Sequence, residues 1–288
     1  MNSLYRLSAL FFAILCMSSS SILIKFSTAP VVIMALYRLL FTAGMSFPLK
    51  HVFKEKPIRW NATLCIQLAT AGIFLALHFV FWFTSLSYTS VSSSVLFTNQ
   101  QVLFVLLFSV LVLKEPLSTK ALYGIVLALV GCSVIAGGDV LRGGLWGDFL
   151  ALVSGFCIAV YFILGRVIRQ TMDTWTYCVG VSFTAALVLL PFAVNLGLEF
   201  WNYPVKEWVL FFFMALLPGI GGHGILNWTL KFLKAPLVAV SILGESVGAS
   251  ALAWIFLHQT LSIYQIIGAG LILLGIYLTV TNEPNYAK

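Results

Sequence analysis

Glu245 lies in an apolar stretch of sequence, where a carboxylate is unusual and calls for a specific role. It belongs to the stretch "SILGESVGASALAWIF", and it is the only residue between positions 235 and 257 that is charged at neutral pH. An ionised group in such a run is costly unless it faces water or a partner, or takes up a proton. Three roles fit: proton coupling, direct binding of a substrate, or a structural hydrogen bond between packed helices.

A second long polar side chain, Gln101, corresponds to Glu245 at an offset of 144 residues. It ends the run Asn99, Gln100, Gln101, whose side chains spread over about 200° of a helix. The three therefore cannot all line one cavity, and we expect at least one to bond a neighbouring helix. Gln101 is the strongest cavity candidate of the three, with such a bond as its alternative role.

Two histidines occupy nearly equivalent positions, His78 in "LALHFVFWF" and His223 in "GIGGHGILNW", 145 residues apart. Each is either a cavity residue or a hydrogen-bonded structural residue. Neither has a His or Cys four residues away, so no metal site is predicted. Trp82, Asn227 and Trp228 lie on the same two stretches, where they could contact a substrate or simply fill space.

Arg38 is the one basic residue expected deep inside an apolar stretch. It could neutralise Glu245, bind an anionic substrate, or extend its side chain toward the membrane surface. Its depth disfavours the last role. We therefore include Arg38 among the candidate cavity residues.

The stretch "LLPGIGGHG", residues 216–224, combines one proline with four glycines inside an apolar run. Such a composition favours a bent or locally unwound helix, because proline removes a backbone donor and glycine is flexible. Its alternative use is close packing against a neighbouring helix.

The sequence lacks the patterns of several other kinds of site. All five cysteines lie in apolar stretches without a CxxC pair, which is typical of small buried residues rather than a disulfide framework. No HExxH or GxSxG motif occurs, so an enzyme is not expected. Basic residues flank the apolar stretches rather than forming a basic-aromatic patch, so no nucleic-acid partner is expected. No cofactor is indicated.

The composition indicates an all-α integral membrane protein. Hydrophobic residues make up 61% of the 288 residues and charged residues 9%, whereas soluble domains carry about 25% charged residues. Apolar runs of this length are typical of membrane-spanning helices. Ten spans are predicted: 4–24, 30–49, 62–86, 91–113, 121–137, 146–164, 175–197, 208–230, 235–257 and 261–280.

The distribution of Lys and Arg predicts the orientation of these spans. With the N-terminus in the cytoplasm, twelve of the sixteen basic residues fall in cytoplasmic segments and three in outer segments, while Arg38 lies within a span. Positive charges concentrate on the cytoplasmic side of membrane proteins. We therefore expect both termini in the cytoplasm and a location in the inner or plasma membrane, with the lipid bilayer as the surroundings.

The chain also shows an internal repeat. Residues 115–131, "EPLSTKALYGIVLALVG", and 259–275, "QTLSIYQIIGAGLILLG", share six of seventeen positions, including two glycines. Five spans per copy means that the second copy enters the membrane from the opposite side. We therefore predict two inverted five-helix repeats, 1–143 and 144–288, related by a pseudo-two-fold axis in the membrane plane.

Two passages resemble the EamA-type transporters of the drug/metabolite transporter superfamily. They are "GDFLALVSGFCIAVYFILGRVIRQ" at 147–170 and "SLSYTSVSSSVLFTNQQVLFVLLFSVLVLKEPLS" at 85–118. The resemblance covers essentially the whole chain. It implies a carrier of small metabolites, often an exporter, with a cavity between two halves. The family's acidic residue in the ninth helix matches Glu245, although Ser246 stands where proline often follows.

The resulting functional expectation is a secondary transporter that works by alternating access. Its substrate would be a small metabolite, with an amino acid or related compound as one option, and export as the expected direction. Protons are a candidate coupling ion. The alternative is a passive channel or facilitator, which would share the same helices but would not accumulate its solute.

Overall fold

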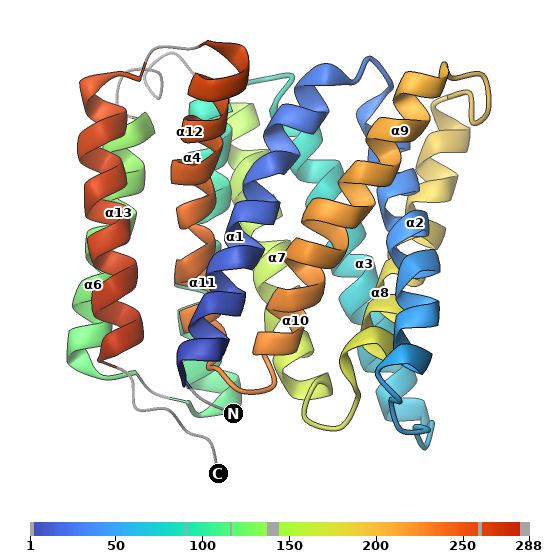
Figure 1. Cartoon of the computed structure of the whole chain (residues 1–288), viewed down its shortest axis with the longest axis horizontal. Coiled ribbons are helices and arrows are strands. Elements are labelled where there is room, and N and C mark those ends of the chain that lie inside the picture. The colour runs from blue at the N-terminus through green and yellow to red at the C-terminus, as the bar shows by residue number, and fades with distance from the viewer. Residues whose placement is uncertain (1–2, 90, 116, 137–143, 259–260, 283–288) are drawn as a thin grey trace.

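The structure is a computed structural model that describes residues 3–89, 91–115, 117–136, 144–258 and 261–282. Every regular element in these residues is helical (Figure 1). Ten helical stretches among them are long and apolar enough to cross a membrane. The all-α fold and the ten spans predicted from the sequence are therefore confirmed.

Each half of the chain supplies five spans, and three of these ten spans are built from more than one helical segment. The first half contains α1 (Ser3–Phe26), α2 (Val31–Val52), α3 (Ala62–Ser85), the composite span α4 (Val91–Asn99), α5 (Gln101–Phe108) and η1 (Ser109–Leu113), and α6 (Thr119–Ala136). The second contains α7 (Leu145–Ile168), α8 (Thr174–Asn195), the composite span α9 (Val205–Met214), η3 (Ala215–Gly224) and α10 (Ile225–Thr229), the composite span α11 (Ala235–Ile242) and α12 (Gly244–Leu257), and α13 (Ile263–Thr281).

The bundle has two distinct ends. α1 begins and α13 ends at the lower edge of Figure 1, which we call the terminal side. The α1–α2 turn and the loop before α9 lie at the other edge, which we call the opposite side. Because the number of spans is even, the two ends of the described chain lie on the same side.

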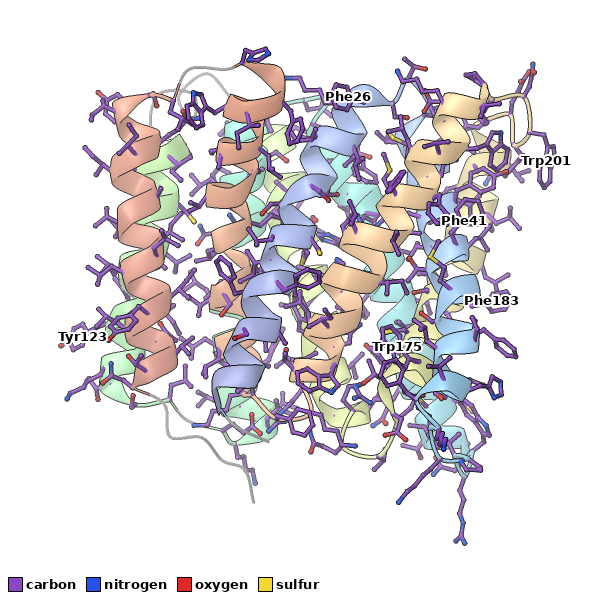
Figure 2. The ribbon with its side chains drawn as sticks, viewed as in Figure 1. Phe26, Phe41, Tyr123, Trp175, Phe183 and Trp201 are labelled. Atoms are coloured by element: carbon purple, nitrogen blue, oxygen red, sulfur yellow. The ribbon has the colours of Figure 1, made fainter. Side chains whose placement is uncertain are left out.

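Apolar side chains cover the outside of the bundle (Figure 2). Phe183, for example, is 51% exposed in the middle of α8. Such a surface is unfavourable in water and favourable against lipid tails. Trp60, Trp146 and Trp201 are exposed near the ends of spans, where tryptophans typically lie at the membrane interface.

Spans four and nine are both interrupted near their middle. α4 ends at Asn99 and α5 begins at Gln101, while α11 ends at Ile242 and α12 begins at Gly244. At each interruption the backbone tightens: the Gln100 N–H donates to Phe97 O at 3.2 Å, and the Leu243 N–H donates to Val240 O at 3.1 Å. The first interruption lies directly before the predicted site residue Gln101, and the second lies two residues before Glu245. Gln100 and Leu243 both keep right-handed helical dihedral angles, so each interruption is a local tightening of one turn within a continuous span.

Span eight contains a ten-residue π-helix, η3, over the stretch whose proline and glycines predicted bending or close packing. Both features are present. Pro218 has no backbone N–H to donate, which favours a departure from the α-helix. Gly221 and Gly222 pack directly on α1, where an added Cβ would lie 2.8 Å from Cys16 Sγ and 2.5 Å from Met17 Cγ respectively.

α6 and α13, the fifth helices of the two halves, pack against each other through glycines. A Cβ on Gly131 would lie 2.7 Å from the Gly268 carbonyl oxygen, and a Cβ on Gly124 would lie 2.6 Å from the Gly275 carbonyl oxygen. Only glycine permits backbones to approach this closely. These are the glycines that aligned in the sequence repeat, and we call this contact the α6–α13 seam.

Two glutamates tie the halves together, one on each side of the bundle. On the terminal side Glu55 accepts bonds from the N–H and the hydroxyl of Thr176, both at 2.8 Å. On the opposite side Glu207 accepts bonds from the N–H and the hydroxyl of Thr28, both at 3.0 Å. Each carboxylate thus binds unpaired donors next to a helix start that belongs to the other half.

Candidate functional site

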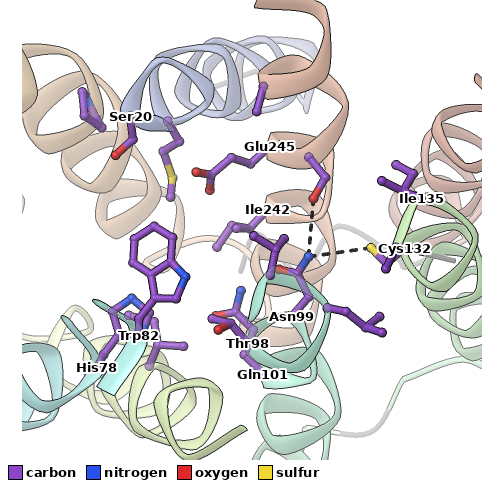
Figure 3. Close-up of a pocket in the computed structure, with 18 of the residues that line it drawn as sticks. Ser20, His78, Trp82, Thr98, Asn99, Gln101, Cys132, Ile135, Ile242 and Glu245 are labelled. Carbon is purple, nitrogen blue, oxygen red and sulfur yellow. Dashed lines mark hydrogen bonds between the residues drawn. The ribbon is translucent and has the colours of Figure 1, made fainter. Parts of the chain in front are cut away.

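A central cavity of about 260 Å³ lies between the two halves (Figure 3). It extends from the middle of the bundle toward the opposite side, where Ala136 and Gln265 line it near the ends of α6 and α13. Six of the eight residues predicted as site candidates line this cavity: Glu245, Gln101, His78, His223, Arg38 and Trp82.

Three buried polar atoms on the cavity wall have no hydrogen-bond partner among the described residues. They are Gln101 Oε1, Trp82 Nε1 and His223 Nδ1. The Trp82 nitrogen is a donor, the Gln101 oxygen is an acceptor, and the histidine nitrogen can be either. Leaving such a group unpaired costs about 1–3 kcal/mol. The wall is therefore suited to a small solute, or waters, offering both donors and acceptors.

Arg38 and Glu245 place opposite charges on the same cavity. Arg38 is buried, donates to Ser20 Oγ at 3.3 Å and lies 5.2 Å from the centre of the Phe79 ring. In the described part of the chain, Arg38 and Glu245 form no ion pair within 4.0 Å. The Glu245 side chain extends into the cavity from the first turn of α12 (Figure 3). Both charged ends thus border the cavity without neutralising each other by direct contact.

Two of the three consecutive polar residues of span four reach the cavity. Asn99 and Gln101 both line it, whereas the Gln100 amide donates back to Leu96 O of its own span at 3.2 Å. The expectation that the three could not all face one cavity is therefore met. Asn99 also donates to Ser246 Oγ at 3.4 Å, which links span four to span nine beside Glu245.

The two histidines differ in how they are held. His78 Nδ1 lies 2.8 Å from Ser154 Oγ of α7, and its ring stacks on Trp82 with the centroids 5.9 Å apart. His223 meets the Tyr161 ring edge-on, with the centroids 6.2 Å apart. His78 therefore combines the two roles considered from the sequence, since it bonds a neighbouring helix and lines the cavity.

Asn227 and Trp228 lie outside the central cavity. Asn227 accepts a bond from the Tyr161 hydroxyl at 2.9 Å and borders a small void of about 20 Å³ next to Arg38. Trp228 borders a separate hollow on the terminal side. The π-helix η3 precedes both residues and changes their direction relative to an ideal helix, because it has more residues per turn than an α-helix.

The terminal side of the cavity is closed by packing and by one ion pair. Val105, one turn from Gln101, and Ser241, one turn from Glu245, are each 0% exposed. Further toward the terminal side, Arg166 NH2 of the second half lies 2.8 Å from Glu115 Oε1 of the first half. Arg166 NH1 also donates to Leu230 O at 2.7 Å.

Several wall residues were not anticipated from the sequence, among them Ser20, Thr98, Cys132, Ser250 and Gln265. Small polar residues are common in membrane helices, so their presence alone does not distinguish a cavity from a packed contact. Ser246 had a usable signal, because it follows Glu245 directly. The Glu115–Arg166 pair was also missed, since its partners are far apart in sequence.

Comparison with known proteins identifies the family of this bundle. Residues 5–137 and, separately, residues 145–281 match the EamA-like transporter family. The chain belongs to the EamA-like transporter family. Two copies of the family's helical unit, each with five spans, together account for nearly all of the described chain.

Curated relatives and a solved structure are also similar to this chain. The uncharacterized transporter YyaM of Bacillus subtilis is 26% identical, with 93% of this chain and 87% of that protein covered. A probable amino-acid metabolite efflux pump of Salmonella typhimurium is 28% identical over 62% of this chain and 64% of that protein. A crystal structure with 16% identity superposes with a TM-score of 0.79, covering 96% of this chain and 98% of that one. This EamA protein is thus a multi-pass membrane transporter of a small molecule.

Proposed function

We propose that this EamA protein is a secondary transporter that carries a small metabolite through the central cavity by alternating access. The observation that carries the proposal is the composition of the cavity wall. Both halves contribute to it: Arg38 and Gln101 from the first, His223 and Glu245 from the second. Charges of both signs and unpaired polar atoms meet at mid-membrane, where polar groups usually mark a substrate path.

The two halves, 1–143 and 144–288, act in this proposal as inverted repeats. Their helix contacts support it. The contact of α3 with α7 has its equivalent in the contact of η3 with α1. The contacts of α2 with α8 and of α6 with α13 each join equivalent spans of the two halves. Exchanging the equivalent spans of the two halves therefore leaves this set of contacts unchanged. Inverted repeats allow one half to adopt the shape of the other, which converts an outward-open form into an inward-open form.

We assign the terminal side to the cytoplasm of a cell that keeps the protein in its inner or plasma membrane. The basic residues of the loops gather on this side, as expected for cytoplasmic segments. In this orientation the cavity extends toward the outside and the Glu115–Arg166 pair closes the inside. The structure then corresponds to an outward-facing state, with the cytoplasmic side shut.

The substrate we propose is an amino acid or a related compound, moved outward. A carboxylate could contact Arg38 and an ammonium group could contact Glu245, with apolar side chains such as Phe79 and Ile158 beside them. The name of the Salmonella relative, a probable amino-acid metabolite efflux pump, points the same way. The closed terminal side disfavours a passive channel, because a channel needs a path open at both ends.

Transport by purified protein in liposomes, with and without a pH gradient, tests this function. The E245Q variant keeps the size of the side chain and loses its ability to titrate. If Glu245 couples protons, E245Q still exchanges labelled amino acid but no longer concentrates it in response to the pH gradient. If Glu245 binds substrate, exchange weakens as well.

E199Q is the matched control, because Glu199 is an exposed carboxylate in the loop before α9. It should transport as the parent does. An E245Q variant that folds and transports like the parent at every pH would limit Glu245 to a structural role. Product formation instead of movement would indicate an enzyme, and flux without counterflow would indicate a channel.

A further inference from the structure

A second hollow, of about 690 Å³, lies on the terminal side among α1, η3, α10 and the start of α8. We call it the terminal crevice. Its wall is largely apolar and includes Phe12, Ile220, Trp175 and Trp228. Phe12 is 54% exposed on the outside of the bundle. The crevice therefore reaches the lipid-facing surface, and it is separate from the central cavity.

Two glycines of η3 line this hollow and let its walls approach each other closely. They are Gly221 and Gly224, and a Cβ on Gly221 would lie 2.8 Å from Cys16 Sγ of α1. A Cβ on Gly224 would lie 3.1 Å from the Trp175 ring. Trp175 also packs against Phe53, with the ring centroids 5.8 Å apart. The indole thus forms a firm apolar wall at the level where tryptophans meet lipid headgroups.

The rim of the crevice is cationic. Lys54, Lys56 and Lys231 line it, together with two carboxylates, Glu55 and Asp173. Both carboxylates are already engaged. Glu55 accepts bonds at the start of α8, including one from the Trp175 N–H at 2.7 Å, and Asp173 pairs with Lys231 at 3.5 Å. Within the described residues, Lys54 and Lys56 have no carboxylate within 4.0 Å of their ammonium groups.

The backbone holds these two lysines at the rim. Lys54 has a left-handed conformation, with φ of 49°, at the end of α2. Glycine is the usual residue at such a position, because side chains disfavour it. The Lys56 N–H donates to Asp173 Oδ2 at 3.2 Å. The bonds of Glu55 and the Lys56 N–H thus fix the segment that carries both ammonium groups.

We infer that the terminal crevice binds an anionic phospholipid. The phosphate of the headgroup contacts Lys54 and Lys56, and an acyl chain lies along Phe12, Ile220 and Trp228. Charge complementarity and the apolar wall select this occupant together, since basic pockets between membrane helices bind anionic headgroups. A free anion would leave the apolar wall exposed to water, and a zwitterionic lipid would neutralise the rim less fully. The lipid would bridge the α2–α3 loop of the first half and span eight of the second.

Native mass spectrometry of the full-length protein, with added phosphatidylglycerol or phosphatidylcholine of identical chains, tests this site. The parent should retain phosphatidylglycerol preferentially. The K54Q/K56Q variant should bind it about 25-fold more weakly, because each basic residue near an anionic headgroup contributes about fivefold in affinity. The matched control is K114Q/K120Q. It removes the same charge from the same side, and Lys114 has a similar left-handed conformation with φ of 55°.

A second variant tests the apolar part of the crevice. Ala9 lines it, and A9F should fill the space and reduce phosphatidylglycerol retention without changing the charge. Equal retention of the two lipids by the parent, or an equal loss in K54Q/K56Q and K114Q/K120Q, would overturn the site. Competition by inorganic phosphate, with A9F binding like the parent, would instead assign the rim to a free anion. If K54Q/K56Q fails to fold, the single K54Q and K56Q variants and A9F give the same readout.

Discussion

Replacing Glu115 by glutamine is expected to favour the state that is open on the terminal side. Glu115 Oε1 accepts bonds from Arg166 NH2 at 2.8 Å and from Arg166 Nε at 3.3 Å, and the two side chains are 25% and 15% exposed. Hydrogen bonds to charged groups contribute about 1.5–3 kcal/mol, and charge-assisted bonds are roughly twice as strong as neutral ones. The E115Q substitution should therefore destabilise the closed state, relative to the terminal-side-open state, by about 1–1.5 kcal/mol.

That free energy corresponds to a roughly five- to tenfold larger population of the terminal-side-open state, since about 1.4 kcal/mol equals a factor of ten. A cysteine at position 105 reports this population. Val105 is 0% exposed and lies one turn from Gln101, toward the closed side. After replacement of the five native cysteines, the rate at which a maleimide labels V105C should rise roughly five- to tenfold when E115Q is added.

D173N provides the control on the same side. Asp173 and Lys231 lie 3.5 Å apart and are 34% and 37% exposed, so their pair contributes only about 0.5 kcal/mol and its loss should change labelling about twofold. Labelling of V105C at the parent rate in E115Q, or an equal increase in D173N, would refute the gating role of the Glu115–Arg166 pair.

Three further predictions concern packing, the inter-half ties and topology. G131V should lower the melting temperature in detergent by several degrees or prevent folding, because its Cβ would meet a carbonyl oxygen of α13 at 2.7 Å; G270V, with nothing within 4 Å of its Cβ, should melt like the parent. E207A should destabilise the protein by about 1–3 kcal/mol, because it leaves a backbone donor at the α1–α2 turn unpaired. The control E199A should melt like the parent. Equal melting temperatures of the two variants would refute the stabilising role of Glu207 between the halves. A cysteine at Lys56 should react with an impermeant reagent only from the cytoplasmic face, so labelling of intact cells at this position would reverse the assigned orientation.

Helix number and the depth of polar residues could be predicted from the sequence, because both depend on local composition. Glu245 and Gln101 were located at mid-membrane by counting along their spans, and both line the same cavity. The glycines that aligned in the repeat also mark a real contact, the α6–α13 seam. Periodic patterns and glycine spacing are properties of single helices, and so one sequence is enough to detect them.

Contacts between helices were harder to predict. The sequence does not set the distance between Glu115 and Arg166, which are 51 positions apart and form the ion pair on the terminal side. It also does not show that the helix tightens at Gln100, between Asn99 and Gln101, which both line one cavity. Trp228 was grouped with the cavity candidates because it lies on the same stretch as His223, whereas in the structure it follows a π-helix and lines the terminal crevice.

The α6–α13 seam has a consequence for protein engineering. The spacing of these two helices is set by backbone atoms, since glycine meets carbonyl oxygen on both sides of the contact. The same helices contribute Cys132, Ala136 and Gln265 to the cavity wall. No change of rotamer can move these backbones, and the glycines that set their spacing have no side chain to shorten. Mutant libraries designed to admit bulkier substrates should therefore vary α1, α3 and η3. The wall formed by α6 and α13 should be left unchanged, because its fixed position limits the size of the substrate.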